Sequence, residues 1–402
     1  RRHTRLQGDW SSDVCSSDLR TVLIRFDFNV PIENEKILDD FRIQQSIPTI
    51  KFCLEQGAKL VLMSHLGRPN GNVDKNLSLI PVGEKLAEIL EMPIKFSHDC
   101  ISDDAIEVSR SLKDGEIHLL ENLRFYKEEE LNDPKFASRL SSHGSIYIND
   151  AFGLTHRLHA SNSSIIDNFS VKGIGLLIEK ELQYLSDSLK NPQKPLTLII
   201  GGAKIGTKID IINNFLDIAD NILIGGAMAN TFLFSKGKNI GKSLFENEKV
   251  KNAREILENA KKSKTKIHLP LDSTGSMNNL INKKDFTLKT NQIEDDMVIA
   301  DIGPETVELY TSIISKSKTV FWNGTMGVSE MSHFSEGNNK IIDSIVSSNS
   351  ESIIGGGDTI SSITNYNKSL LSEFSHISTG GGATLHLLSG NKLPAIDILD
   401  RK

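Results

Sequence analysis

Short runs rich in β-branched residues alternate along most of the chain with longer segments of helix-like composition, and this alternation constrains the fold more than any other feature. Because crossover helices cover both faces of a parallel sheet, its strands are continuously apolar, so the pattern predicts an α/β fold with parallel sheets. The runs expected to form strands are TVLIRFDF, AKLVLMSH, EIHLLEN, SIYINDAF, LTLIIGGA, NILIGGA, KIHLPLD, TVFWNG and SIIGGG.

The chain has 402 residues, which is too long for one ordinary core, so two domains are expected. Between the two series of strands, the segment IEKELQYLSDSLKNPQKP places apolar residues near helical spacing and ends at Pro192 and Pro195. We interpret it as a helix between the domains. A surface helix of the second domain is an equally good interpretation of the same pattern.

Net charge and cysteine usage exclude several classes of protein. The formal charge of −6 argues against a surface for nucleic acid or anionic membranes, and no apolar run approaches the length of a membrane span. Cys15, Cys53 and Cys100 share no metal-like spacing and cannot all pair, which favours a reducing cytoplasm.

The stretch IIGGGDTISSI predicts a phosphate site, because glycines expose backbone N–H groups and the following helix start favours an anion. Asp358 would repel a phosphate unless a cation stood between them, which suggests a magnesium ion carrying nucleotide oxygens. The alternative is a tight turn between strand and helix that binds no ligand.

Arginine is unevenly distributed, since Arg254 and Arg401 are the only arginines after Arg157 whereas lysines continue throughout. A chain that uses Lys for ordinary solvated charge keeps Arg where a planar bidentate fork matters. The arginines that follow strand ends are expected to converge on one basic cleft, together with polar residues that also follow strands. These candidates are Asp27, Asn29, Arg42, His65, Arg68, Arg124 and Arg157. His156 and His159 lack a third metal ligand of suitable spacing, which favours a structural or phosphate-contacting role.

Lys204 and Lys208 follow a strand in LIIGGAKIGTKIDII and are four residues apart, so a helix beginning here would place both ammonium groups on one side. Such a like-charge pair is useful where a polyphosphate neutralises it. The segment lacks the Walker A spacing, and no G-x-G-x-x-G dinucleotide fingerprint occurs in the chain.

Eight motifs occur in an order that resembles phosphoglycerate kinases: RFDFNVP, SHLGRP, LLENLRF, NDAFG, GGAKIGTK, WNGTMGV, IIGGGDT and STGGGA. The resemblance runs from about Thr21 to the C-terminus. It implies two doubly wound parallel-sheet domains, the first binding 3-phosphoglycerate and the second binding MgATP or MgADP, with the final residues packing on the first domain. The domains implied are 20–177 and 192–385, with 1–19 an extraneous or disordered leader, 178–191 the interdomain helix and 386–402 the returning segment.

Motif by motif, the resemblance also implies site residues. Those for the acid substrate are Asp27, Phe28, Asn29, Arg42, His65, Leu66, Gly67, Arg68, Arg124 and Arg157. Those for the nucleotide are Lys204, Lys208, Glu330, Gly356, Gly357, Asp358 and Thr359, with Asp358 facing the metal. Arg42, Lys204, Gly356 and Gly357 would contact the transferring group and are the implied catalytic residues.

Two departures from the family pattern lie near the expected nucleotide site. The family usually has W-N-G-P-x-G-V-F-E, where this chain has Thr325 and Ser329 in place of the proline and phenylalanine. It commonly has M-G-L before D-I-G-P-E, where this chain has Val298, Ile299 and Ala300. A bulkier residue thus replaces a glycine beside the expected adenine pocket.

Other functions were weighed against this one. A Rossmann dehydrogenase needs a dinucleotide fingerprint, which the sequence lacks. A solute-binding protein that closes over an anion would not explain a second site of magnesium type, and an inactive relative acting as a scaffold stays an alternative. The attacking carboxylate is already ionised at neutral pH, so the expected reaction needs no general base. The expected enzyme is a cytoplasmic monomer that excludes water by hinge closure.

Overall fold

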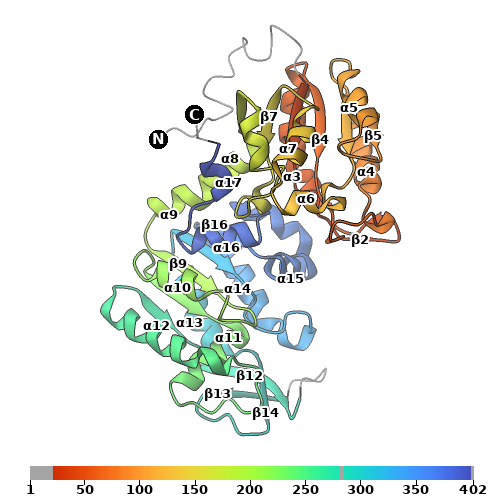
Figure 1. Cartoon of the computed structure of the whole chain (residues 1–402). Coiled ribbons are helices and arrows are strands. Elements are labelled where there is room, and N and C mark those ends of the chain that lie inside the picture. The colour runs from red at the N-terminus through yellow and green to blue at the C-terminus, as the bar shows by residue number, and fades with distance from the viewer. Residues whose placement is uncertain (1–20, 280–284, 400–402) are drawn as a thin grey trace. The chain divides into compact units, whose positions relative to one another are not determined.

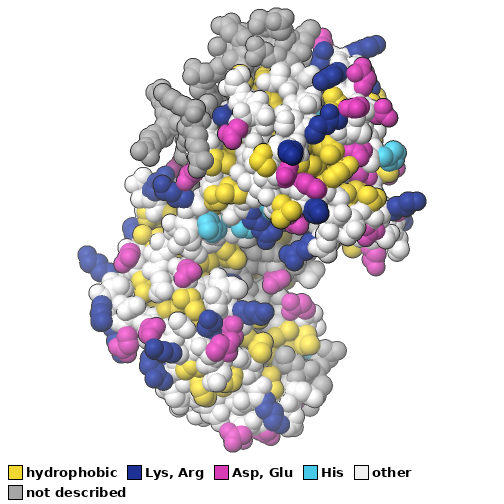
Figure 2. All heavy atoms as spheres, in the orientation of Figure 1, with side chains coloured by type: hydrophobic (Ala, Val, Ile, Leu, Met, Phe, Trp, Pro, Cys, Tyr) yellow, Lys and Arg dark blue, Asp and Glu magenta, His cyan; other side chains and the backbone are white. Residues whose placement is uncertain are grey.

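The computed structural model describes residues 21–279 and 285–399, which form two compact units (Figure 1). Unit 1 extends to Leu182 and also contains the segment from Lys392 onward, whereas unit 2 is the contiguous stretch Gln183–Asn391. Within the described ranges, no helix combines the length and the apolar character that crossing a membrane requires. Figure 2 shows acidic and basic side chains interspersed over the face that it presents.

Unit 1 contains a 6-stranded sheet in the order β5-β6-β4-β1-β7-β8, and every pair of neighbours is parallel. The central strand β1 is continuously apolar from Val22 to Ile24, and all three of these side chains are buried, as expected for a strand covered on both faces. The strands are β1 (Thr21–Arg25), β4 (Lys59–Met63), β5 (Ile94–Ser97), β6 (Ile117–Leu120), β7 (Ile146–Asn149) and β8 (Val171–Ile174).

The helices of unit 1 connect these strands, and a small hairpin lies at the edge of the unit. The helices are α3 (Phe41–Glu55), α4 (Ile80–Leu90), α5 (Asp103–Arg110), α6 (Lys127–Glu130), α7 (Pro134–Ser141), α8 (Leu176–Leu182) and α17 (Pro394–Asp397). The hairpin consists of β2 (Ile32–Glu33) and β3 (Lys36–Ile37). Helix α17 joins the unit from the far end of the chain, where the Ala395 N–H donates to the Thr155 carbonyl at 3.1 Å.

Unit 2 contains a second 6-stranded parallel sheet, in the order β11-β10-β9-β15-β16-β17. The chain adds strands outward from β9 in one direction and then, after β15, in the other. This is a doubly wound sheet, and its order reverses between β9 and β15. The strands are β9 (Leu196–Ile200), β10 (Asn221–Ile224), β11 (Lys266–His268), β15 (Thr319–Asn323), β16 (Glu351–Gly355) and β17 (His376–Ile377).

The main helices of unit 2 are α10 (Ile209–Phe215), α11 (Gly226–Ser235), α12 (Val250–Lys262), α13 (Pro304–Ile314), α14 (Glu336–Val346), α15 (Gly357–Asn367) and α16 (Gly382–Leu388). The unit also carries an antiparallel sheet in the order β13-β12-β14, formed by β12 (Asp272–Met277), β13 (Phe286–Lys289) and β14 (Met297–Ile302). The sequence patterns did not predict this antiparallel sheet.

The segment predicted as an interdomain helix is helical. It comprises α8, a π-helical turn over Gln183–Asp187 and α9 (Ser188–Lys190), and the division between the compact units falls at Leu182/Gln183. At the other end, 386–391 lies in unit 2, whereas the chain from Lys392 belongs to unit 1. The exact domain boundaries stay a prediction, and the predicted leader 1–19 lies outside the described residues.

Two buried histidines of unit 1 are linked through Ser109 by a chain of hydrogen bonds. His143 Nε2 lies 2.9 Å from the Cys100 carbonyl, which can only accept, so Nε2 carries the proton and Nδ1 accepts from the Ser109 hydroxyl at 2.6 Å. Ser109 Oγ then accepts from His118 Nδ1 at 2.8 Å. His118 Nε2 is left to accept from Ser97 Oγ, also at 2.8 Å. If either imidazole were protonated, both of its ring nitrogens would donate and the serine hydroxyls would have to turn, Ser109 Oγ toward the Ala105 carbonyl at 3.3 Å.

We therefore expect unit 1 to lose stability in mild acid. Burial is the main cause that lowers the pKa of His118 to about 3 and that of His143 to about 4. In the unfolded chain both titrate near ~6.5, so the unfolded state binds more protons as the pH falls below that value. The stabilisation is complete above ~6.5, and between pH 7 and pH 5 each histidine should lower the free energy of unfolding by about 2 kcal/mol.

Native-state hydrogen exchange of the β6 amides at several pH values measures this loss within unit 1 alone. A double variant, His118→Gln with His143→Gln, serves as the reference, because subtracting its profile removes the contribution of every other titrating group. If the wild-type profile is no steeper than that of the variant, the neutral chain does not control stability.

Candidate functional site

The basic cluster of unit 1 is built at the carboxyl ends of β1 and β4. Arg42, near the start of α3, reaches back over the end of β1, where its Nη1 lies 3.1 Å from Asp27 Oδ2 and 3.1 Å from the Asn29 carbonyl oxygen. The Asn29 amide oxygen accepts from the Gly67 N–H at 2.9 Å, and Arg124 Nη1 donates to the Gly67 carbonyl at 2.8 Å. Residues from three segments that are far apart in sequence are thus joined at one edge of the sheet.

Burial and nearby cations keep the imidazole at this edge neutral. His65 is buried and its Nδ1 lies 4.0 Å from Asp27 Oδ1. Burial holds the pKa of His65 well below its usual value, and the neighbouring charges of Arg25, Arg124 and Arg42 lower it further. His65 therefore acts as a neutral hydrogen-bonding group, and the positive charge of the cluster comes from its arginines.

The remaining predicted residues of unit 1 differ in exposure. Arg68 and Arg157 are exposed, and Arg157 Nε donates to His156 Nε2 at 3.1 Å. Burial is the largest cause that lowers the pKa of Arg124, and the charge of Arg157 lowers it further. Phe28 and Leu66 have buried side chains in the hydrophobic core, so only their backbone atoms are available to a ligand.

Sequence reasoning missed the buried polar layer that supports this cluster. Arg25 is fully buried, its Nε donates to Ser161 Oγ at 2.8 Å, and its Nη2 lies 3.6 Å from Glu129 Oε1. His159 Nδ1 lies 3.8 Å from the same carboxylate oxygen, and burial lowers its pKa to about 3. A single arginine inside the apolar run TVLIRF was the signal that could have revealed this layer, because a buried charge requires a partner.

In unit 2, three loops touch through their backbones at the point where the strand order reverses. The Gly202 N–H donates to the Thr325 carbonyl at 2.8 Å, and the Gly226 N–H donates to the Met326 carbonyl at 2.7 Å. A Cβ on Gly201 would lie 2.1 Å from the Thr325 carbonyl oxygen, so only glycine allows this approach. Open α/β sheets bind ligands in the crevice outside such a reversal point.

The predicted glycine turn lies at the same edge and leads into a helix as expected. Gly356 has φ +99°, and helix α15 begins at the next residue with Asp358 exposed in its first turn. Thr359 is buried, and its hydroxyl accepts from the Gly324 N–H at 2.7 Å, so this side chain braces the turn against the loop after β15.

The predicted stacking of two lysines on one helix face is wrong. Helix α10 begins only at Ile209, so Lys204 and Lys208 both lie in the turn before it. Lys204 is exposed, whereas Lys208 is buried and its Nζ donates to the Gly201 carbonyl at 2.5 Å and the Asn323 carbonyl at 3.1 Å. Burial lowers the pKa of Lys208 to about 8, and the charge of Asp358 partly offsets this.

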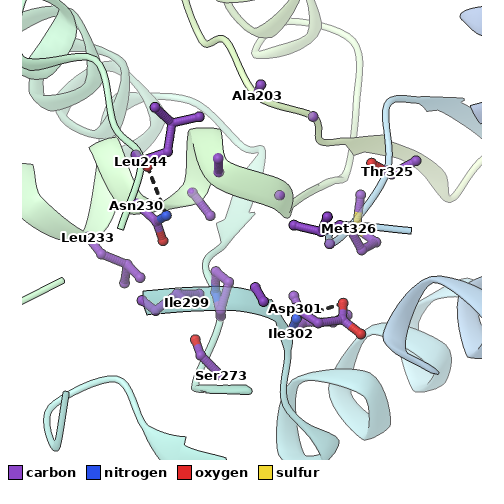
Figure 3. A pocket seen from close by; sticks show the side chains of 18 of the residues that line it. Ala203, Asn230, Leu233, Leu244, Ser273, Ile299, Asp301, Ile302, Thr325 and Met326 are labelled. Atoms are coloured by element: carbon purple, nitrogen blue, oxygen red, sulfur yellow. Dashed lines mark hydrogen bonds between the residues drawn. The ribbon is translucent and has the colours of Figure 1, made fainter. Parts of the chain in front are cut away.

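A cavity of about 240 Å³ opens between these loops and the antiparallel sheet (Figure 3). Its lining includes Gly202, Ala203, Gly226, Thr325, Glu330 and Asp358 near the loops. Leu233, Leu244 and Ile299 make the lining apolar elsewhere. The cavity therefore combines backbone and carboxylate groups with an apolar compartment, which is the usual composition of a small-molecule site.

The donor set at this cavity fits a magnesium ion that arrives with a ligand. Among the residues that the structure describes, no three His, Cys, Asp or Glu side chains are grouped to hold a metal by themselves. Magnesium is usually held by one or two carboxylates together with substrate phosphates. The exposed Asp358 carboxylate beside the cavity satisfies the protein's share of such a site.

The family model for phosphoglycerate kinase matches residues 13–391. The chain belongs to the phosphoglycerate kinase family. The match begins inside the segment that sequence analysis set aside as a leader. The chain is 44% identical over 392 residues to the phosphoglycerate kinase of Finegoldia magna, covering 95% of this chain and 97% of the relative. It is 44% identical over 400 residues to that of Chlorobium phaeobacteroides, covering 98% of this chain and 100% of the relative.

Solved structures of the family share the fold. The phosphoglycerate kinase structure from Coxiella burnetii matches with a TM-score of 0.86 and 36% identity, covering 94% of this chain and 96% of that chain. The one from Pyrococcus horikoshii matches with a TM-score of 0.82 and 30% identity, covering 95% and 96%. Membership of the phosphoglycerate kinase family confirms the predicted doubly wound α/β fold and the predicted class of enzyme, a kinase that uses a magnesium nucleotide.

The glycine turn provides a test of whether its backbone conformation requires glycine. Gly356→Ala should destabilise unit 2 by about 1–3 kcal/mol, because alanine is strained at positive φ. Its Cβ would also lie 3.0 Å from Asn323 Nδ2. Gly357→Ala is the matched control, since a Cβ there meets nothing within 4 Å. Calorimetric unfolding of both variants measures the difference, and equal midpoints would contradict the strain.

Proposed function

We propose that this chain catalyses the reversible transfer of a phosphoryl group between MgATP and the carboxylate of 3-phosphoglycerate, giving 1,3-bisphosphoglycerate and MgADP. The observation that carries the proposal is the pairing of two sites in a chain of this family: a basic cluster in unit 1 and a glycine-lined cavity at the reversal point of a doubly wound sheet in unit 2.

The acid substrate is assigned to the basic cluster. Arg42 contacts Asp27 and Asn29 through its Nη1 alone. Within the described residues, its Nε and Nη2 donate to no protein group. Those donors would face a ligand phosphate or the transferring group, which suits the fork geometry of guanidinium. The other residues assigned to this substrate are Asp27, Phe28, Asn29, His65, Leu66, Gly67, Arg68, Arg124 and Arg157.

The nucleotide is assigned to the cavity of unit 2. The amides of Gly356 and Gly357 and the exposed ammonium of Lys204 would hold the phosphates, and Glu330 would face the ribose. Lys208 is assigned an indirect part, because its Nζ already holds two backbone carbonyls beneath the loops. Asp358 would hold the magnesium ion, which neutralises phosphate charge when it is bound, and Thr359 would keep the turn in place.

The chemistry then depends on position and charge. The acceptor carboxylate is ionised at neutral pH, so the reaction needs no side chain to remove a proton. Phosphoryl transfer requires in-line placement and neutralisation of spreading negative charge, which Arg42, Lys204 and the glycine amides would supply. A coupled assay of MgADP formation tests the reaction directly, and no MgADP formation above the background rate would contradict it.

We further propose that the protein acts as a monomer in the cytoplasm. The support is that a single chain carries the residues for both substrates, and that Cys100 is a free, buried cysteine, as in a reducing compartment.

Arg42→Ala should weaken 3-phosphoglycerate binding and lower turnover by about 10²- to 10³-fold, because one preorganised donor is lost from the transferring group. MgADP binding should be unchanged, and the exposed Arg254→Ala in α12 is a control for loss of a positive charge. Calorimetric titration of each substrate together with the coupled assay measures these effects. If the Arg42 variant kept both turnover and acid-substrate binding, the assignment of the basic cluster would be wrong.

Ligand-driven closure is expected because the acyl phosphate product hydrolyses readily and water must be excluded during transfer. Small-angle scattering should show a smaller radius of gyration with 3-phosphoglycerate and MgADP together than with either ligand alone. An unchanged radius in the ternary complex would rule out closure as the step that assembles the site.

A further inference from the structure

The turn that carries Lys204 runs from Gly202 to the start of α10, and it is anchored at both ends. At the first end, the Gly202 N–H donates to the Thr325 carbonyl at 2.8 Å. At the second end, the buried Nζ of Lys208 donates to two backbone carbonyls. Lys204 lies between these anchors, directly after Ala203, which lines the cavity. Its side chain is exposed, and among the described residues no group pairs with its ammonium, so the direction of this charge depends on the backbone that carries it.

Two contacts fix the middle of this turn, one on its buried side and one on its exposed side. The Ile205 side chain is buried in the core, and its carbonyl accepts from the Lys208 N–H at 2.8 Å. On the exposed side, the Gly206 N–H donates to Glu246 Oε2 at 3.0 Å. This bond joins residues that are 40 positions apart in the chain. The Glu246 carboxylate therefore holds the exposed side of the turn from outside it.

Glu246 is itself held by a buried helix. Thr231 in α11 is 1% exposed, and its Oγ1 accepts from the Glu246 N–H at 3.1 Å. The Glu246 carbonyl accepts from the Lys249 N–H at 3.0 Å, which closes a short turn around the residue. A Cβ on Gly206 would lie 3.4 Å from Glu246 Oε1 and 3.3 Å from Lys249 Cε, so both side chains pack against the glycine. The carboxylate thus links a rigid helix to the exposed turn.

We infer that Glu246 is a positioning residue that acts on the transferring phosphoryl group through Lys204. By accepting from the Gly206 N–H, it keeps the turn in one conformation and so keeps the Lys204 ammonium directed at that group. Without this acceptor the exposed N–H would bond to water, and the turn would sample more conformations. The inference rests on the proposed function, because it requires Lys204 to contact the transferring group.

The first test separates phosphoryl transfer from nucleotide binding. Glu246→Ala should lower the single-turnover rate of phosphoryl transfer by about 5- to 10-fold, because the ammonium is less often in place for the transition state. The calorimetric affinity for MgADP should change by less than about 2-fold, since MgADP lacks the transferring group and the turn keeps its anchors at both ends. General damage to the cavity would weaken MgADP binding as well. Glu246→Gln keeps an acceptor oxygen and should retain the rate within about 2-fold.

A double-mutant cycle tests whether the effect passes through Lys204. If it does, Glu246→Ala should lower the rate of the wild type but should leave the already low rate of Lys204→Ala unchanged. Glu248→Ala is the matched control, because it removes an exposed carboxylate from the adjacent turn Asn247–Lys249 and should keep the wild-type rate. Calorimetric unfolding of each variant checks that unit 2 stays folded.

Several outcomes would overturn the inference while leaving the kinase function intact. These are a wild-type rate in Glu246→Ala, an equal loss of rate in Glu246→Gln, a loss of MgADP affinity as large as the loss of rate, and an equal loss with and without the Lys204 side chain. Failure of the wild-type protein to form MgADP from MgATP and 3-phosphoglycerate would instead overturn the proposed function.

Discussion

Direct contact between backbones at the reversal point of the second parallel sheet is the constraint on which the cavity of unit 2 depends. The loops after β9, β10 and β15 exchange N–H to carbonyl hydrogen bonds at 2.7–2.8 Å, and a Cβ on Gly201 or Gly226 would collide with them. Glycine at these positions lets the loop backbones touch, and Ala203, Thr325, Glu330 and Asp358 line the cavity beside them. The buried ammonium of Lys208 holds two of the carbonyls that converge beneath it, which allows a charge to be buried at this point.

In unit 1, side chains rather than backbone loops build the candidate site. Its cluster of guanidinium groups rests on a buried layer in which Arg25 and Glu129 neutralise each other and Ser161 bonds to both. At the strand ends, Arg42 pairs with Asp27 at 3.1 Å and Arg124 pairs with Glu130 at 3.2 Å, and both keep guanidinium N–H groups for a ligand. Burial first, and the neighbouring cations after it, lower the pKa values of His65 and His159, so acidification within the physiological range adds little charge here.

The strand runs and the family motifs predicted most of the fold, whereas the roles of the site residues stay a prediction. Every run named from the sequence contains a strand of one of the two parallel sheets, because continuous apolar runs are specific to strands covered on both faces. The antiparallel sheet escaped prediction because β12 reads DSTGSM, whose small polar residues carry no apolar signal, and because its pairing is interrupted by a bulge at Thr274/Gly275. The positions of the Lys204 and Lys208 side chains were predicted wrongly, because a spacing of four residues gives a shared face only where a helix has already begun.

Unit 2 is an uninterrupted stretch of chain inserted into unit 1, whose helix α17 follows it in sequence and bonds to Thr155. During synthesis, every residue of unit 2 leaves the ribosome before α17 does. The inserted unit can therefore complete its core while its host still lacks the final piece.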